Sequence, residues 1–260
     1  MTLVDVVLEG PVGRVWLNRP EQHNALTPEL GDELISALHA LAHHDTIRVM
    51  VLGGRGPSFC AGADLGAMKA SAGAGFDENL AEAERLGAVF AALADFPKPV
   101  VGRIHGSVFG GGMGLLCACD IPVASRDSKF GLTEVRLGIL PALISPYVIR
   151  RLGDRNAREM MLTGERFDAE TALRLGLVQA VSEPKELDAR VDERVKALLE
   201  AAPLAQTRIK QLLALYRQAS ADDYRAALPR TLAEVRSGPE AREGLAAYFA
   251  KRKPEWTQDE

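Results

Sequence analysis

The chain has 260 residues, of which 47% are hydrophobic and 25% are charged, so it can bury the core of one large domain. Its net charge is −4 and its basic residues are scattered, which argues against a nucleic-acid-binding surface. The sequence has no run of ~20 apolar residues that could span a membrane, and its first residues carry no secretory-signal pattern. We therefore expect a cytoplasmic protein with no membrane or nucleic-acid partner.

The first ~140 residues alternate predicted strands and helices. Two apolar runs separated by a Gly-Pro turn predict a hairpin over residues 4–17. Thr27, followed by proline, predicts a helix N-terminus, and the apolar spacing continues that helix to about residue 43. A continuous apolar run at 47–52 predicts a strand that is buried on both faces. This alternation predicts an α/β fold with parallel strands and right-handed crossovers.

The second half of the sequence is mainly helical. A Gly-, Ala- and Ser-rich stretch at 66–75 is expected to be mobile, and a helix at 78–94 and a strand at 100–105 follow it. Later helices are predicted at 142–152, 154–163, 168–175, 184–201, 203–217, 220–236 and 238–250, with one short strand at 177–181. We expect two domains, a core at 1–195 and a helical region at 196–260.

Three cysteines, Cys60, Cys117 and Cys119, have apolar neighbours and no metal-binding spacing. They are interpreted as buried thiols in a reducing compartment, and no metal site is expected. His105 ends a predicted strand and has no evident ligand partner. It is therefore interpreted as a packing histidine or as one that contacts the site residues without touching the substrate. No serine lies in a nucleophile elbow, which argues against a peptidase.

Two glycine-rich turns are the strongest functional signal in the sequence. One covers residues 59–64, and the other is the triple glycine at 110–112, which opens a predicted helix. Neither has the spacing of a dinucleotide-binding motif or a P-loop. Glycine lets the backbone approach a ligand, and a helix N-terminus presents amides that have no partner within the helix. Two such turns could stabilise one oxyanion, although tight turns in an α/β protein are the plainer interpretation.

Glu134 is a carboxylate in an otherwise apolar stretch. Partial burial there would raise its pKa and suit it to proton transfer. The alternative interpretation is a solvated or salt-bridged glutamate beside Arg136.

Several motifs in a fixed order resemble the crotonase (enoyl-CoA hydratase/isomerase) superfamily over nearly the whole chain. The motifs are Leu17-Asn18-Arg19-Pro20, Asn24-Ala25-Leu26, Phe59-Cys60-Ala61-Gly62-Ala63-Asp64-Leu65, His105-Gly106, Gly110-Gly111-Gly112, Phe130-Gly131, Glu134, Leu137-Gly138, Pro141 and Thr163-Gly164-Glu165. The resemblance implies a crotonase-like spiral of ββα units and a C-terminal helical trimerisation region. It also implies a homo-oligomer, either a trimer or a dimer of trimers.

The resemblance also implies the site residues. The amides of Ala63 and Gly111 would hold the thioester oxygen of an acyl-CoA substrate, and Glu134 would move the proton. The implied substrate-binding positions are Ala25, Leu26, Ala61, Asp64, Leu65, Gly110 and Lys251. Coenzyme A is then part of the substrate, and no metal or other cofactor is expected.

Gly114 departs from the family pattern, because related hydratases carry a second catalytic glutamate there. This departure and the segment after Glu134 look like the bacterial methylglutaconyl-CoA and isohexenylglutaconyl-CoA hydratases. A second carboxylate on the substrate would then compensate for the absent glutamate. We therefore expect hydration of a branched or carboxylated enoyl-CoA. The alternatives are a double-bond isomerase, which needs one carboxylate, and a non-catalytic acyl-CoA-binding homologue.

Overall fold

The computed structural model describes residues 2–257, except for the side chains of Leu65, Ala70 and Ser71. The chain divides into two compact units. Unit 1 comprises residues 1–96 and 100–194, and unit 2 comprises residues 97–99 and 195–260. The sequence does not single out residues 97–99, which belong to the C-terminal unit. Among the described residues, no helix has the length and apolar composition that crossing a bilayer would require.

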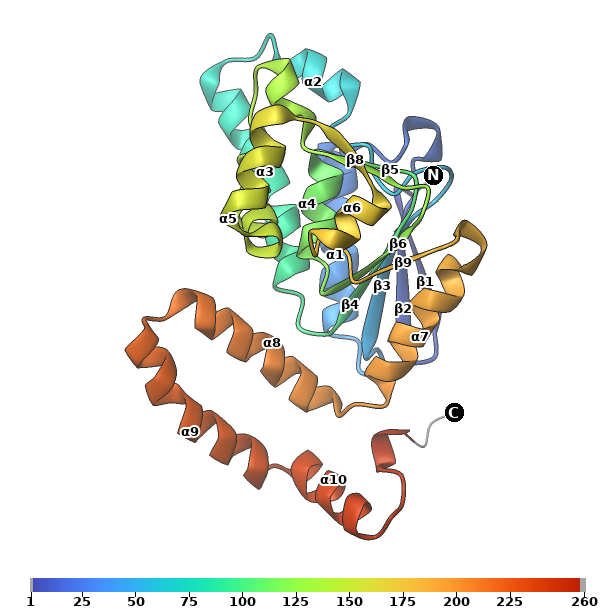
Figure 1. Ribbon diagram of the computed structural model, residues 1–260, viewed down its shortest axis with the longest axis vertical. Coiled ribbons are helices and arrows are strands. Elements are labelled where there is room, and N and C mark those ends of the chain that lie inside the picture. The colour runs from blue at the N-terminus through green and yellow to red at the C-terminus, as the bar shows by residue number, and fades with distance from the viewer. Residues whose placement is uncertain (1, 258–260) are drawn as a thin grey trace. The chain divides into compact units, whose positions relative to one another are not determined.

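Unit 1 is built on a six-stranded sheet with the order β1-β2-β3-β4-β6-β9 (Figure 1). Its strands are β1 (Val4–Glu9), β2 (Val12–Leu17), β3 (Val49–Gly54), β4 (Val100–Ile104), β6 (Ile121–Ser125) and β9 (Ala180–Ser182). The β1–β2 hairpin is antiparallel, and every other neighbouring pair in this sheet is parallel. All six residues of β3 are buried, as expected for a central parallel strand. The predicted α/β fold is confirmed.

Over the described residues, seven α-helices belong wholly or partly to unit 1: α1 (Pro28–Ala42), α2 (Leu65–Ser71), α3 (Phe76–Ala94), α4 (Gly111–Ala118), α5 (Ser145–Thr163), α6 (Ala169–Arg174) and α7 (Leu187–Leu199). The Thr27 hydroxyl caps α1 by accepting the Leu30 amide at 3.3 Å. A Cβ on Gly13 of β2 would lie 3.0 Å from Leu41, so α1 covers the face of β2 that carries Gly13.

The other face of the sheet carries polar and aromatic side chains. Arg14 and Trp16 alternate with Gly13 and Val15 along β2 and therefore point away from α1. The first turns of α7 lie on this face, because Asp192 bonds to Arg14 at 2.8 Å. Helices thus cover both faces of the sheet around β2.

A second, three-stranded sheet joins β5 (Ser107–Phe109), β7 (Lys129–Gly131) and β8 (Arg166–Asp168) in the order β5-β7-β8. The sequence analysis missed all three strands, because a three-residue strand is too short to show an alternating pattern. This sheet nevertheless positions the site. The chain leaves β5 to enter α4, and it leaves β7 to enter the 3₁₀ helix η2 (Thr133–Leu137).

Unit 2 contains α8 (Pro203–Gln218), α9 (Ala221–Ser237) and α10 (Pro239–Phe249), each within one residue of its predicted ends. Ser220 caps α9 by accepting the Asp223 amide at 3.1 Å. Two predictions in unit 1 were less accurate: the helix expected from residue 142 begins at Ser145, and the last strand begins at Ala180. The stretch at 66–75 contains most of α2, and its mobility stays a prediction.

Candidate active site

The first glycine-rich turn, at residues 59–64, is held by a parallel bridge between Leu26 and Ala63. The Leu26 amide donates to the Gly62 carbonyl at 2.7 Å, and the Asp64 amide donates to the Leu26 carbonyl at 3.0 Å. In such a ladder the amide between these two bonds points the opposite way. The Ala63 N–H is therefore directed away from the bridge, and it has no acceptor among the described residues.

The second turn places Gly110 at the N-cap of α4 with a φ of 47°, a conformation that favours glycine. The Gly110 carbonyl accepts the amides of Met113 and Gly114 at 2.9 and 3.2 Å, which closes the first helical turn. Gly111 is the first helical residue, and its amide has no acceptor among the described residues. It also lies at the positive end of the α4 dipole.

Backbone hydrogen bonds hold the two turns side by side. The Cys60 amide donates to the Ser107 carbonyl at 3.2 Å, and the Phe109 amide donates to the Cys60 carbonyl at 3.1 Å. A Cβ on Gly62 would lie 3.0 Å from the Phe109 carbonyl oxygen and 3.8 Å from the Gly110 Cα. The structure therefore brings together the turns that carry the Ala63 and Gly111 amides.

Glu134 enters this site from η2. Its Oε1 lies 3.3 Å from the point that a Cβ on Gly110 would occupy. Its Oε2 is buried and has no hydrogen-bond partner within the described part of the chain. Burial raises the pKa of the Glu134 carboxyl above its usual value, against the opposing hydrogen bond from its own amide. The alternative interpretation, a solvated glutamate paired with Arg136, does not fit, because Glu134 is half-buried beside the two turns and forms no ion pair among the described residues.

Apolar side chains fill the space where a second acid would lie. A Cβ on Gly114 would be 2.3 Å from Ile144 Cγ2 and 2.7 Å from Phe90 Cε1. A Cβ on Gly111 would be 2.6 Å from Leu26 Cδ1. The first turn of α4 is thus enclosed by hydrocarbon, and residue 114 has no room for a side chain. The sequence showed that Gly114 stands where related hydratases have a glutamate. It did not predict that the side chains of Ile144 and Phe90 would fill that space.

Gly114→Glu is expected to destabilise the protein without restoring a second acid. The new side chain must displace two buried apolar groups, and overpacking of this kind costs about 1–3 kcal/mol. For a chain of this size each kcal/mol lowers Tm by about 2–4 °C. Thermal unfolding measures the loss, and combining the change with Ile144→Ala should recover part of it. An unchanged Tm for the single variant would contradict the fit described above.

An arginine and an asparagine, to which the sequence analysis gave no role, support the first turn. Arg19 donates to the Ala25 carbonyl at 2.5 Å and forms an ion pair with Asp64 at 3.0 Å. The buried Asn24 accepts the Arg19 amide at 2.8 Å and donates to the Ser58 carbonyl at 2.7 Å. Both residues occur in the motifs noted above, which was the available signal.

The remaining predicted binding positions differ in their placement. Ala61 lies beside the Leu26 segment, because its amide donates to the His23 carbonyl at 2.9 Å. Asp64 caps α2 by accepting the Gly66 and Ala67 amides at 2.8 and 3.2 Å. Burial opposes its ionisation, but Arg19 and these amides outweigh burial and lower the Asp64 pKa.

Two of the predicted positions are not brought to the site by the described contacts. Lys251 belongs to unit 2, where it is exposed and its amide donates to the Tyr248 carbonyl at 3.2 Å. The Leu65 side chain lies outside the described residues, although its backbone begins α2.

Comparison with known proteins adds independent evidence. The family model described as enoyl-CoA hydratase/isomerase matches residues 8–259. A short-chain-enoyl-CoA hydratase of Clostridium acetobutylicum is 32% identical, with 98% of each chain covered. The crystal structure of an enoyl-CoA hydratase from Shewanella pealeana has a TM-score of 0.93 and 37% identity, covering 98% of this chain and 96% of that one. Pseudomonas aeruginosa AtuE has a TM-score of 0.95 and 36% identity, covering 99% of this chain and all of that one.

The match to the family model and these likenesses confirm the resemblance that the motifs carry and the crotonase fold that it implies. They cover the sheet, the two glycine turns and the C-terminal helices alike. The chain therefore belongs to the enoyl-CoA hydratase/isomerase family of enzymes.

Proposed function

We propose that the protein adds water across the α,β-double bond of an enoyl-CoA. The observation that carries this proposal is the position of the Glu134 carboxyl beside Gly110, between two turns whose Ala63 and Gly111 amides have no acceptor among the described residues. Two such amides can hold the thioester oxygen. Each well-placed donor to a developing oxyanion is worth about 3 kcal/mol.

A single carboxylate can serve both halves of the reaction. The water oxygen attacks Cβ, the electron pair of the C=C bond moves toward the thioester, and the Glu134 carboxylate takes the proton of the water. The same proton then passes to Cα as the enolate collapses. The raised pKa of Glu134 suits it to both roles, because a carboxyl whose pKa lies closer to neutral pH can both accept and donate a proton there. This scheme uses no metal and no redox cofactor.

We further propose that the substrate is a branched or carboxylated enoyl-CoA such as 3-methylglutaconyl-CoA. Ile144 and Phe90 occupy the place of a second acid, so the protein offers no second carboxylate there to hold the water. A carboxylate on the substrate itself could supply that contact. The resemblance to methylglutaconyl-CoA and isohexenylglutaconyl-CoA hydratases supports the same class of substrate.

The filled space at Gly114 also favours a second candidate, a double-bond isomerase. A 1,3-proton shift uses one proton carrier and no attacking water. Under this mechanism Glu134 would take a proton from one carbon of the enoyl chain and return it two carbons away.

A screen of enoyl-CoA thioesters by mass spectrometry separates these functions. We expect 3-methylglutaconyl-CoA to gain one water faster than crotonyl-CoA does, with Glu134→Gln as the inactive control. A strong preference for crotonyl-CoA would overturn the proposed substrate class. A changed retention time without a mass change would indicate an isomerase. Binding of acyl-CoA without turnover of any thioester would indicate a non-catalytic homologue.

We also propose that the protein is a trimer or a dimer of trimers. Each unit exposes large apolar side chains, among them Leu137 and Leu140 in unit 1 and Tyr248 and Phe249 in unit 2. Contiguous exposed apolar surface is typical of protein–protein interfaces. Lys251 would then contact the phosphates of coenzyme A bound in a neighbouring subunit.

Size-exclusion chromatography with light scattering is expected to give a mass of three or six chains. The double variant Leu137→Asp/Leu140→Asp should shift that mass toward one chain, because burying two carboxylates in an apolar interface is costly. A monomeric wild-type protein would contradict this proposal.

A further inference from the structure

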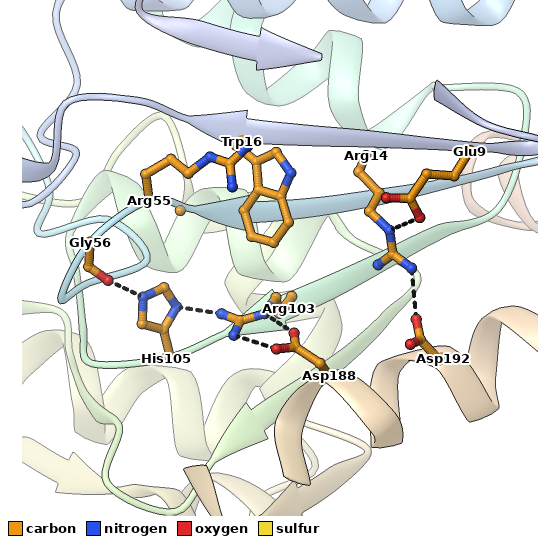
Figure 2. Close-up of a pocket in the computed structure, with 10 residues that line it drawn as sticks. Glu9, Arg14, Trp16, Arg55, Gly56, Arg103, His105, Asp188 and Asp192 are labelled. Carbon is orange, nitrogen blue, oxygen red and sulfur yellow. Dashed lines mark hydrogen bonds and ion pairs between the residues drawn. The ribbon is translucent and has the colours of Figure 1, made fainter. Parts of the chain in front are cut away.

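A polar cavity of about 510 Å³ lies on the face of the six-stranded sheet that points away from α1 (Figure 2). Its lining residues are Glu9, Arg14, Trp16, Gly54, Arg55, Gly56, Arg103, His105, Asp188 and Asp192. All three of its arginines are already paired with carboxylates: Arg14 with Glu9 and Asp192, Arg55 with Asp5, and Arg103 with Asp188. The cavity therefore does not resemble a free anion site. Among these lining residues, His105 is connected to the candidate active site, because its carbonyl accepts the Phe59 amide at the start of the first glycine-rich turn.

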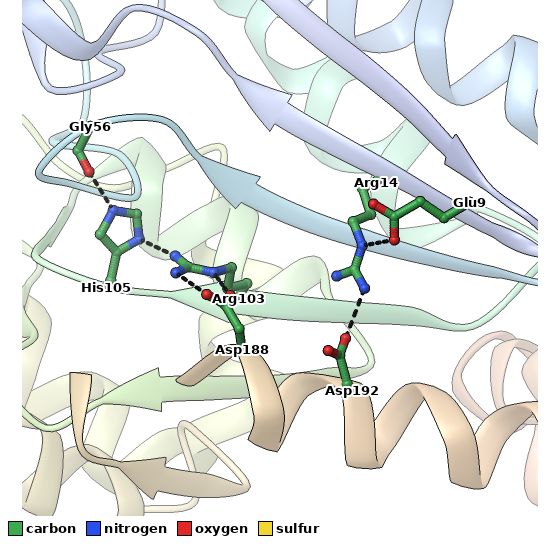
Figure 3. A network of polar contacts seen from close by, with 7 residues as sticks. All are labelled: Glu9, Arg14, Gly56, Arg103, His105, Asp188 and Asp192. Atoms are coloured by element: carbon green, nitrogen blue, oxygen red, sulfur yellow. Dashed lines mark hydrogen bonds and ion pairs between the residues drawn. The ribbon is translucent and has the colours of Figure 1, made fainter. Parts of the chain in front are cut away.

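The contacts of His105 define its protonation state (Figure 3). Its Nε2 lies 2.9 Å from the Gly56 carbonyl oxygen, and its Nδ1 lies 3.2 Å from Arg103 Nη1. A carbonyl oxygen can only accept a hydrogen bond and a guanidinium can only donate one. Both bonds therefore form only when the imidazole is neutral, with its proton on Nε2 and a lone pair on Nδ1.

Arg103 is held beside the His105 ring by an ion pair and by burial. Its Nε bonds to Asp188 at 2.5 Å, and its side chain is only 16% exposed. Protonation of His105 would set an Nδ1–H against the Arg103 donor and break that hydrogen bond. Burial lowers the pKa of His105, and the charge of Arg103 lowers it further, while the Gly56 carbonyl, Asp127 and Asp188 oppose the shift. Arg55, which forms an ion pair with Asp5, also lines this cavity.

His105 connects two segments just before they enter the two glycine turns. Gly56 lies in the loop between β3 and the first turn, and the His105 carbonyl accepts the Phe59 amide at 2.8 Å. Ser58 adds a second link, because its Oγ accepts the Ser107 amide at 3.3 Å. The backbone ladder from Cys60 to Phe109 begins immediately after these contacts. The His105 ring thus adds a side-chain contact to the backbone bonds that hold these two segments together.

We propose that His105 is a positioning residue: its neutral imidazole ties the loop before the first turn to Arg103 and so sets the Ala63 amide relative to the Gly111 amide. Protonation removes this tie and lowers the polarisation of the bound thioester. The proposal rests on the proposed function, because it needs an acyl-CoA held by the two amides.

Three variants test the role of the ring. In His105→Gln the amide can donate to Gly56 and accept from Arg103 at every pH, so we expect wild-type kcat at pH 8. The kcat of this variant should fall less steeply at acid pH than that of the wild-type enzyme, because protonation of Glu134 then remains and protonation of His105 does not. His105→Leu lacks both bonds and should lose about tenfold in kcat, less than the 10²–10³-fold lost when one donor is removed. Its KM should change little. His39→Gln, at an exposed position in the last turn of α1, is the matched control.

The infrared carbonyl stretch of bound butyryl-CoA gives a readout that does not need turnover. We expect a shift to lower frequency in the wild-type protein at pH 8 and in His105→Gln. The shift should be smaller in His105→Leu and in the wild-type protein at acid pH. The positioning role would be overturned by equal carbonyl shifts in the wild-type protein at both pH values and in both variants. It would also be overturned if kcat of His105→Gln fell at acid pH as steeply as that of the wild-type enzyme. Failure of butyryl-CoA to bind the wild-type protein would instead overturn the proposed function.

Discussion

Glu134→Gln is expected to lower kcat by about 10²–10⁴-fold, the usual contribution of a positioned proton-transfer group. Glutamine keeps the size of the side chain and its place beside Gly110, but it cannot exchange a proton at neutral pH. Binding of a saturated acyl-CoA should survive, because the Ala63 and Gly111 amides are unchanged. Steady-state kinetics and a binding titration of the same preparation measure the two effects.

The same variant is expected to unfold at a higher temperature than the wild-type protein at pH 7–8. Burial raises the pKa of the Glu134 carboxyl, so the folded state binds more protons than the unfolded state above the usual glutamate value. Stability therefore falls as pH rises through this window, and an uncharged glutamine avoids that loss. The gain in Tm should vanish at pH values below the usual glutamate pKa.

Glu165→Gln is the matched control, because Glu165 is exposed and no hydrogen bond or ion pair joins its side chain to either turn among the described residues. It should leave both kcat and Tm unchanged. Wild-type kcat in Glu134→Gln would remove this residue from the mechanism. A lower Tm at neutral pH would show that its burial does not oppose ionisation.

Gly112→Ala is expected to abolish most activity by forcing the two turns apart. A Cβ at this position would lie 2.1 Å from the Cys60 carbonyl oxygen and 3.0 Å from its carbon. Both are backbone atoms in the ladder that pairs Cys60 with Phe109, so they cannot yield as a side chain can. We expect a loss of at least about 10²-fold in kcat/KM, comparable to the loss of one oxyanion donor, and a lower Tm.

Gly87→Ala provides the comparison, because Gly87 lies inside α3 and its Cβ would meet only Leu143 at 3.6 Å. This change should keep full activity and raise stability by up to about 1 kcal/mol, because alanine favours the helix over glycine. Full activity in a folded Gly112→Ala protein would show that close approach of the two turns is unnecessary.

The sequence was informative wherever a feature depended on neighbouring residues. Thr27-Pro28 gave the start of α1 because a cap is made within one helical turn. The two glycine turns and Glu134 were recognised as motifs, and the structure places them together. The long helices of unit 2 were predicted within one residue because their periodicity extends over several turns.

The sequence was uninformative where a feature depends on residues far apart in the chain. The bond between Arg103 and Asp188 joins positions 85 residues apart, and nothing in their local sequence pairs them. The same holds for Ile144 and Phe90 around Gly114. The strands β5, β7 and β8 are formed by pairing with one another, so three residues of local pattern could not reveal them.

The close fit of Ile144 and Phe90 over Gly114 also bears on how enzymes of this family diverge. A codon change that introduced glutamate at 114 would meet a steric penalty before the new carboxylate could do any chemistry. In this chain a smaller residue at position 144 would have to come first. A single substitution at position 114 therefore cannot add a second carboxylate without disturbing the packing around α4.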